Sequence, residues 1–198
     1  MSIGYGAVER FGPDSGDTWL NYVACFGVPH LKEVISLDGL LCPNLVKDLT
    51  DDDWQQNLVD DGLIFYFHHL DYFLSRFNVP ANYQIVAIVK NPNGSETLDD
   101  PRFEFIGYDL IEADMGGGIS TLTNCGGWDK AFADSDLSEY GLVVSFERAT
   151  RIKQLLIQYY PDDPHALCDL CAVWRMVKNR STTGMTSCLL QNLSERKD

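Results

Sequence analysis

The sequence predicts an α+β fold, in which a mostly antiparallel sheet is covered on one side by helices and ends in a C-terminal αα-hairpin. Two observations lead to this class. Short apolar and β-branched runs, which are typical of strands, cluster in the first two thirds of the 198-residue chain. Apolar residues at helical spacing dominate residues 148–178. A chain of this length fits one domain, which we expect to span residues 1–180.

The N-terminal third begins with a glycine-rich stretch, residues 1–16, which we expect to be a loosely held lead-in. Residues 19–26 are rich in aromatic and β-branched side chains, and this composition predicts a strand. Thr50 followed by Asp53 matches the capping box that starts a helix. We expect that helix to continue to about Val59.

The middle of the chain carries the clearest strand pattern. Residues 63–77 place aromatic and leucine side chains near helical spacing and predict a helix. Residues 83–90 form a continuous apolar run, which predicts a strand buried on both faces. Residues 103–111 predict a second strand, antiparallel to the first. A glycine-rich loop, residues 115–127, follows.

The C-terminal part predicts two helices. The first ends before Pro161, and its apolar face consists of Ala149, Ile152, Leu155, Leu156 and Tyr159. The second begins with Asp163 as its cap and Pro164 at its first position. Its apolar stripe would consist of Leu167, Leu170, Cys171, Trp174 and Val177. Together the helices would form an αα-hairpin over residues 148–178. Exposure of that stripe would favour a homodimer, and residues 181–198 read as a polar, mobile tail.

Charge is distributed very unevenly along the chain. Residues 1–143 carry 23 Asp and Glu against 7 Lys and Arg, a balance of −16, whereas residues 144–198 carry 6 against 8. Phosphate binding needs clustered Lys and Arg, so this pattern argues against a nucleic-acid partner. It favours a basic protein partner, a bound cation or a highly soluble surface.

Several features predict a cytoplasmic protein with no membrane contact. The chain starts without the basic and apolar segments of a secretory signal, and no apolar run approaches the length of a membrane helix. The six cysteines are then expected to be reduced thiols. No dinucleotide-binding fingerprint or phosphate-binding loop occurs, so no cofactor is expected.

Cys125 is the main candidate for catalysis. It precedes Gly126 and Gly127, whose backbone N–H groups could hold an oxyanion, and a helix start after it would lower the pKa of its thiol. A cysteine nucleophile also needs a base, and His165 is the natural choice downstream. The alternative is a half-buried cysteine in a tight turn.

A metal site is conceivable at His165, Cys168 and Cys171, which follow one another at intervals of three residues. On a helix, however, three such positions drift around the axis and do not converge on one ion. A tetrahedral zinc site would also need a fourth ligand from elsewhere, such as Cys188 or His68. We therefore expect core packing here, and no metal.

The acidic candidates for binding surround the predicted helix start, and they are Asp51, Asp52, Asp53, Trp54, Asp60 and Asp61. They can be read as a solvated helix start or as an acidic docking surface. Two hypotheses follow. The first is a binding protein, such as an inhibitor or immunity-type protein, that docks on a basic partner. The second is a small cysteine hydrolase or transferase that uses Cys125 and His165.

Overall fold

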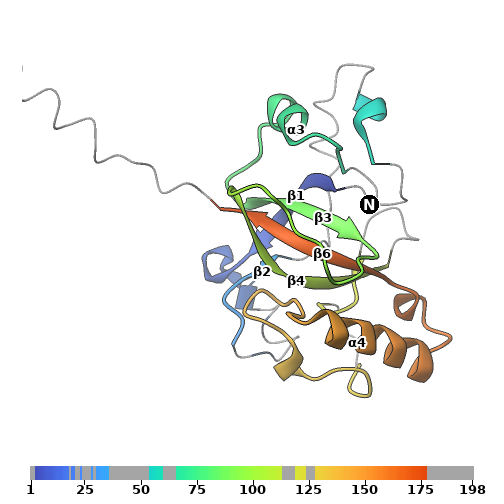
Figure 1. Cartoon of the computed structure of the whole chain (residues 1–198). Coiled ribbons are helices and arrows are strands. Elements are labelled where there is room, and N and C mark those ends of the chain that lie inside the picture. The colour runs from blue at the N-terminus through green and yellow to red at the C-terminus, as the bar shows by residue number, and fades with distance from the viewer. Residues whose placement is uncertain are drawn as a thin grey trace, which may run out of the picture.

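The structure is a computed structural model of the chain (Figure 1). It describes residues 3–17, 19–20, 23, 28, 30–35, 54–59, 66–112, 119–123 and 128–177. These residues form an α+β fold built on one curled antiparallel sheet, which confirms the predicted class.

Six strands make up the sheet, in the order β2-β1-β3-β6-β4-β5, and all neighbouring strands run antiparallel. Their bounds are β1 Gly4–Phe11, β2 Val34–Ile35, β3 Tyr83–Lys90, β4 Phe103–Glu112, β5 Ile119–Ser120 and β6 Asp169–Met176. The longest ladders join β6 to β3 on one side and to β4 on the other. The last described strand therefore lies in the middle of the sheet.

The helices pack around this sheet. α3 (Leu70–Arg76) and α4 (Phe146–Tyr159) lie at opposite ends of the view in Figure 1. Four short 3-10 helices are η1 Pro13–Ser15, η2 Trp54–Asn57, η3 Asp134–Asp136 and η4 Pro164–Ala166. No helix among the described residues is both long and apolar enough to cross a lipid bilayer.

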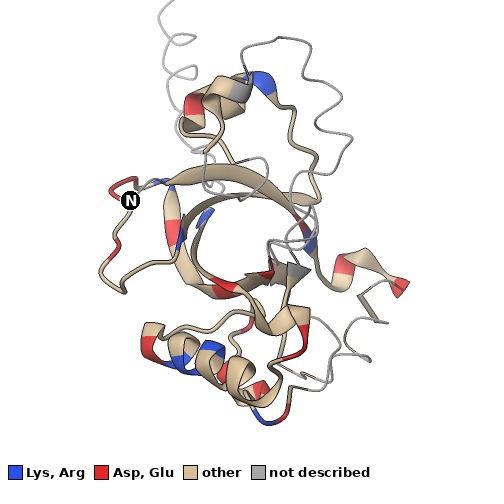
Figure 2. Ribbon diagram, turned by 90° about the vertical axis from the view of Figure 1, so that its right-hand side faces the viewer, with Lys and Arg blue, Asp and Glu red and all other residues tan. Residues whose placement is uncertain are grey.

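Residues 137–143 join the two edges of the curled sheet, which is seen end-on in Figure 2. On one side, Val143 exchanges backbone hydrogen bonds of 2.7 and 3.0 Å with Tyr108 of β4. On the other side, the carbonyl of Glu139 accepts a 2.9 Å bond from the N–H of Lys32, just before β2. The sheet therefore encloses its own small core.

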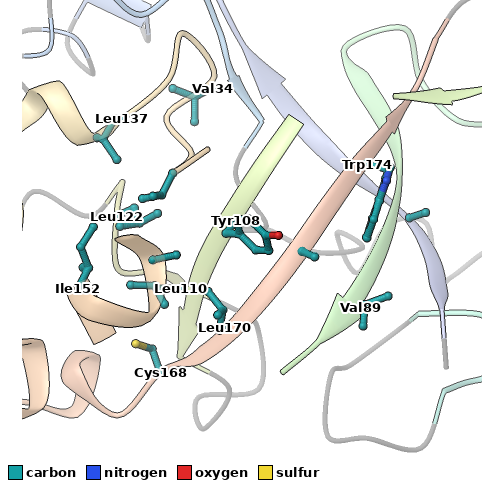
Figure 3. Packing of buried hydrophobic residues seen from close by; sticks show 14 of the residues in the cluster. Val34, Val89, Tyr108, Leu110, Leu122, Leu137, Ile152, Cys168, Leu170 and Trp174 are labelled. Atoms are coloured by element: carbon teal, nitrogen blue, oxygen red, sulfur yellow. The ribbon is translucent and has the colours of Figure 1, made fainter. Parts of the chain in front are cut away.

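Side-chain alternation gives the sheet an inner and an outer core. Along β6, Cys171 and Val173 belong to the inner cluster, while Leu170, Ala172 and Trp174 belong to the outer one. Both helices contribute to the outer cluster, which Figure 3 shows from close by. The helices therefore cover the same outer face of the curled sheet.

The second helix of the predicted αα-hairpin is wrong, because residues 169–176 form strand β6. Its leucine, cysteine and tryptophan positions fit a helical stripe, but Ala172 and Val173 between them are buried as well. A run that is apolar at every position is typical of a central strand with both faces covered. Leu170 and Trp174 are 5% exposed, so the stripe that would have favoured a homodimer is buried in this chain.

Three further expectations need correction. The N-terminal lead-in contains strand β1, whose glycines allow close packing: a Cβ on Gly4 would lie 2.7 Å from the Cβ of Tyr66. Within the predicted strand 19–26, the described Trp19, Leu20 and Val23 are helical. The predicted pairing of strands 83–90 and 103–111 is also wrong, because β6 lies between β3 and β4.

Candidate functional site

Most of the predicted site residues, namely Cys125, Asp51, Asp52, Asp53, Asp60 and Asp61, lie outside the described residues. Trp54 begins the short 3-10 helix η2. His165 is described completely, and it is the residue around which a site can be built.

His165 sits in η4, directly after the turn that ends helix α4. Pro161 follows the helix and Pro164 fixes the first position of η4, so the chain turns sharply between them. The side chain of Asp163 caps this short helix by accepting a 2.9 Å hydrogen bond from the N–H of His165. This cap is the one predicted from the sequence, although a strand follows it in place of a long helix.

Glu112, the last residue of β4, forms an ion pair with Nδ1 of His165. The Glu112 side chain is 3% exposed, whereas that of His165 is 30% exposed. The pair is thus buried at its carboxylate end and open at its imidazole end. Nε2 of His165 has no hydrogen-bond partner among the residues that the structure describes.

Two residues from the segments on either side of residues 124–127 contact His165. The hydroxyl of Thr121 donates a 2.8 Å hydrogen bond to the backbone carbonyl of His165. The ring of Trp128 lies 6.3 Å from the imidazole and packs edge-on against Tyr160 at 5.0 Å. The chain therefore leaves and re-enters the described region beside His165.

Trp128 also carries a buried donor that needs an acceptor. Its side chain is 5% exposed, and its indole Nε1 has no hydrogen-bond partner within the described ranges. Buried polar groups are almost always hydrogen-bonded in native proteins. Its acceptor is therefore a water molecule, a ligand or a group outside those ranges.

Cys168 and Cys171 do not join His165 in a metal site. Cys168 belongs to the outer core with Leu110 and Ile152 (Figure 3), whereas Cys171 belongs to the inner core. Burial raises the pKa of the Cys168 thiol to about 11. Across the described residues, no group of three His, Cys, Asp or Glu is arranged to hold a metal ion.

The positive side chains are largely neutralised within the chain. Those within ion-pair distance of a carboxylate are Arg10, Lys32, Lys90, Arg102, Arg148, Lys153 and Arg175. By contrast, several exposed carboxylates make no ion pair with any described residue, and these are Asp17, Asp99, Asp129, Asp134 and Asp162. The excess negative charge is therefore carried on the surface.

Two of these carboxylates flank the turn that holds His165. Asp162 lies in the turn itself, and Asp129 follows Trp128 in the segment that packs against it. Leu167, two residues after His165, is 68% exposed. Lys130 is the positive side chain nearest in sequence, and it lies over the ring of Tyr159.

Sequence reasoning found His165 but missed Glu112 and Trp128 as its partners. Glu112 directly follows the predicted strand 103–111, and nothing in the sequence indicates that this strand ends next to residue 165. Only the path of the chain through β6 and η4 brings them together. Comparisons with protein family models, curated proteins and solved structures found no match to this chain.

Proposed function

We propose that this protein acts by binding a basic protein partner through its acidic surface. The charge distribution carries the proposal, because most positive side chains are used in ion pairs within the chain while exposed carboxylates remain unpaired. Complementary charge speeds association and selects partners of the opposite sign. An inhibitor or immunity-type protein that covers a basic active surface fits this description.

Two acidic regions are candidates for the contact. The first is the sequence cluster of Asp51, Asp52, Asp53, Trp54, Asp60 and Asp61. The second is the corner formed by Asp129 and Asp162 beside the exposed Leu167. An apolar side chain surrounded by carboxylates suits a partner that presents basic residues around an apolar one.

Affinity capture followed by measurement of salt dependence tests this function. The tagged protein is incubated with lysate of its native host at moderate salt, and bound proteins are identified by mass spectrometry. We expect one stoichiometric basic partner, whose purified form binds less tightly as salt rises. Binding that is indifferent to salt, or no partner, would contradict the proposal.

Charge-neutralising variants then separate the two surfaces. The triple variant D51N/D52N/D53N and the double variant D129N/D162N are compared with D17N/D99N, in which exposed carboxylates elsewhere are removed. We expect the variant at the true contact to slow association at least several-fold and to reduce the salt dependence. Equal association rates in all three variants would exclude both surfaces.

A second candidate function is a cysteine hydrolase or transferase with Cys125 as nucleophile and His165 as base. The contacts of Thr121 and Trp128 with His165 favour it, because these residues flank the segment that carries Cys125. In this mechanism the thiol proton passes to Nε2, and the sulfur forms a bond to an acyl carbon. The leaving group then departs with that proton, and water or another acceptor takes the acyl group.

Thiol modification tests the second candidate directly. Iodoacetamide is added to the folded protein at neutral pH, and the alkylation of each cysteine is followed by peptide mass spectrometry. We expect Cys125 to react faster than the other five cysteines, and H165Q to slow it at least tenfold. Uniform, slow modification would exclude Cys125 as the nucleophile.

A further inference from the structure

We propose that Glu112 is a positioning residue that fixes the tautomer of His165, so that Nε2 acts as a general base at the surface. The inference rests on the second candidate function for its nucleophile, but the geometry of the pair stands independently. It starts from the asymmetry of the contact: the carboxylate is buried and the imidazole reaches solvent.

The position of Glu112 determines which imidazole nitrogen carries the proton. Its carboxylate lies against Nδ1 of His165. An ionised carboxylate only accepts hydrogen bonds, so a neutral imidazole must present Nδ1–H to it. The lone pair is then on Nε2, which has no partner among the described residues and can accept a proton from a nucleophile.

The backbone around His165 holds the ring in this orientation. Asp163 accepts from the backbone N–H of His165, and Thr121 donates to its carbonyl. Trp128 packs edge-on against the ring. A base must be oriented as well as present, and the third residue that orients it completes the arrangement of nucleophile, base and orienting group.

The pair also differs from the other carboxylate contacts in the described part of the chain. Glu33, Glu104 and Asp136, for example, pair with arginines, which have no proton to exchange at neutral pH. Arginine would serve a purely structural pair as well as histidine does. Near the same ring, Trp128 Nε1 is a buried donor whose acceptor lies outside the described residues, so the surroundings of His165 contain a second polar group for a ligand to use.

Imidazole tautomers can be read by nitrogen-15 NMR without any activity assay. The wild-type protein is labelled, and long-range correlations of His165 are recorded above the pH at which it becomes neutral. We expect the Nδ1–H form to dominate by about tenfold, because a hydrogen bond to a charged group is a strong one. Dominance of the Nε2–H form would overturn the proposal.

Substitution of the carboxylate provides the second arm. In E112Q the bond to Nδ1 loses its charge assistance, and we expect the Nδ1–H preference to fall several-fold while the fold is kept. E104Q is the matched control, because Glu104 is also on β4 and is paired with Arg175. An unchanged tautomer ratio in E112Q would overturn the proposal.

The same variants distinguish the failure of this inference from that of the second candidate function. If Glu112 positions the base, E112Q slows Cys125 alkylation about tenfold, and E104Q leaves it unchanged. If Cys125 is slow in the wild type while the Nδ1–H form dominates, the nucleophile is wrong and the positioning role stands. If Cys125 is fast and E112Q leaves both readouts unchanged, the nucleophile stands and the positioning role is wrong.

Discussion

Cys168 shows how burial decides the chemistry of a single side chain. Its residue is 3% exposed, and burial raises the pKa of its thiol to about 11. At pH 7 roughly one thiol in ten thousand would then be ionised, and only the thiolate is nucleophilic. A cysteine three residues from a histidine is therefore not reactive for that reason alone.

We expect Cys168 to resist alkylation by iodoacetamide in the folded protein at pH 7 and to react fully after denaturation in urea. Peptide mass spectrometry measures both rates in one sample. Cys171, which is 0% exposed in the inner core, is an internal comparison that should behave in the same way. Rapid labelling of Cys168 under native conditions would contradict its burial.

Gly107 tests the contact between β4 and the segment that closes the sheet. Its φ of +140° disfavours other residues, and an added Cβ would lie 2.9 Å from the Cβ of Leu142 and 3.0 Å from the carbonyl oxygen of Val143. We expect Gly107→Ala to lower the free energy of unfolding by about 3 kcal/mol, since strain and a steric clash add. Urea denaturation measures this loss.

Gly16→Ala is the matched control for Gly107→Ala. Gly16 also has a positive φ, of +60°, but no heavy atom beyond its chain neighbours lies within 4 Å of its added Cβ. This variant therefore carries the backbone strain without the clash, and we expect about 1 kcal/mol. Equal losses in the two variants would show that residues 142–143 do not pack against β4 as described.

At the scale of elements, the anchoring of helix α4 depends on an ion pair with η3. Two guanidinium nitrogens of Arg148 bind the two carboxylate oxygens of Asp136 at 2.7 and 2.6 Å. This hydrogen bonding from Arg148 holds the pKa of Asp136 below its ordinary value. The carboxylate is largely buried, with 16% of its side chain exposed, while Arg148 is 38% exposed.

The Asp136–Arg148 pair predicts a specific pH dependence of stability. Because the pKa of Asp136 is lower in the folded state, its stabilising contribution is present above the unfolded pKa and is lost as pH falls through the folded pKa. We expect D136N to be about 1 kcal/mol less stable than wild type at pH 7, after allowance for solvent screening. The difference should shrink toward about pH 2.

Thermal or urea denaturation between about pH 7 and pH 2 measures this difference. D134N is the control, because Asp134 is in the same 3-10 helix but makes no ion pair with any residue in the described part of the chain. Its stability should follow that of the wild type at every pH. A constant difference between D136N and wild type down to the lowest pH would contradict the assigned role of the carboxylate.

For the whole molecule, the net charge of −14 sets the response to salt. Screening weakens both the attraction within ion pairs and the repulsion among the carboxylates, and these effects oppose each other. Exposed pairs contribute about 0–1 kcal/mol each, whereas 29 acidic residues face only 15 basic ones, so the repulsion should dominate. We expect Tm to rise by a few degrees between 10 and 150 mM NaCl.

Calorimetry at the two salt concentrations gives this shift. Addition of neutral sucrose at matched osmolarity is the control, because it does not screen charge. A fall in Tm with salt would mean that the ion pairs within the chain outweigh the surface repulsion.

The elements that were predicted correctly are those that local pattern determines. Strand β3 was expected at residues 83–90 and is found there, and the helix facing the core through Ala149 and Ile152 is α4. β6 was missed because its apolar run satisfies a helical stripe as well as a buried strand, and only its neighbours in the sheet decide between them. The contact of Glu112 with His165 was missed for the same reason, since it depends on how distant segments are arranged.

The central place of β6 has a consequence for synthesis of the chain. β3 and β4 are made early, but both pair with a strand that leaves the ribosome almost eighty and sixty residues later, respectively. Until residue 176 emerges, two strand edges face each other with no partner between them, and such edges invite pairing with other chains. Folding therefore waits for the insertion of one late strand, and a nascent chain of this protein has reason to depend on chaperones until that strand arrives.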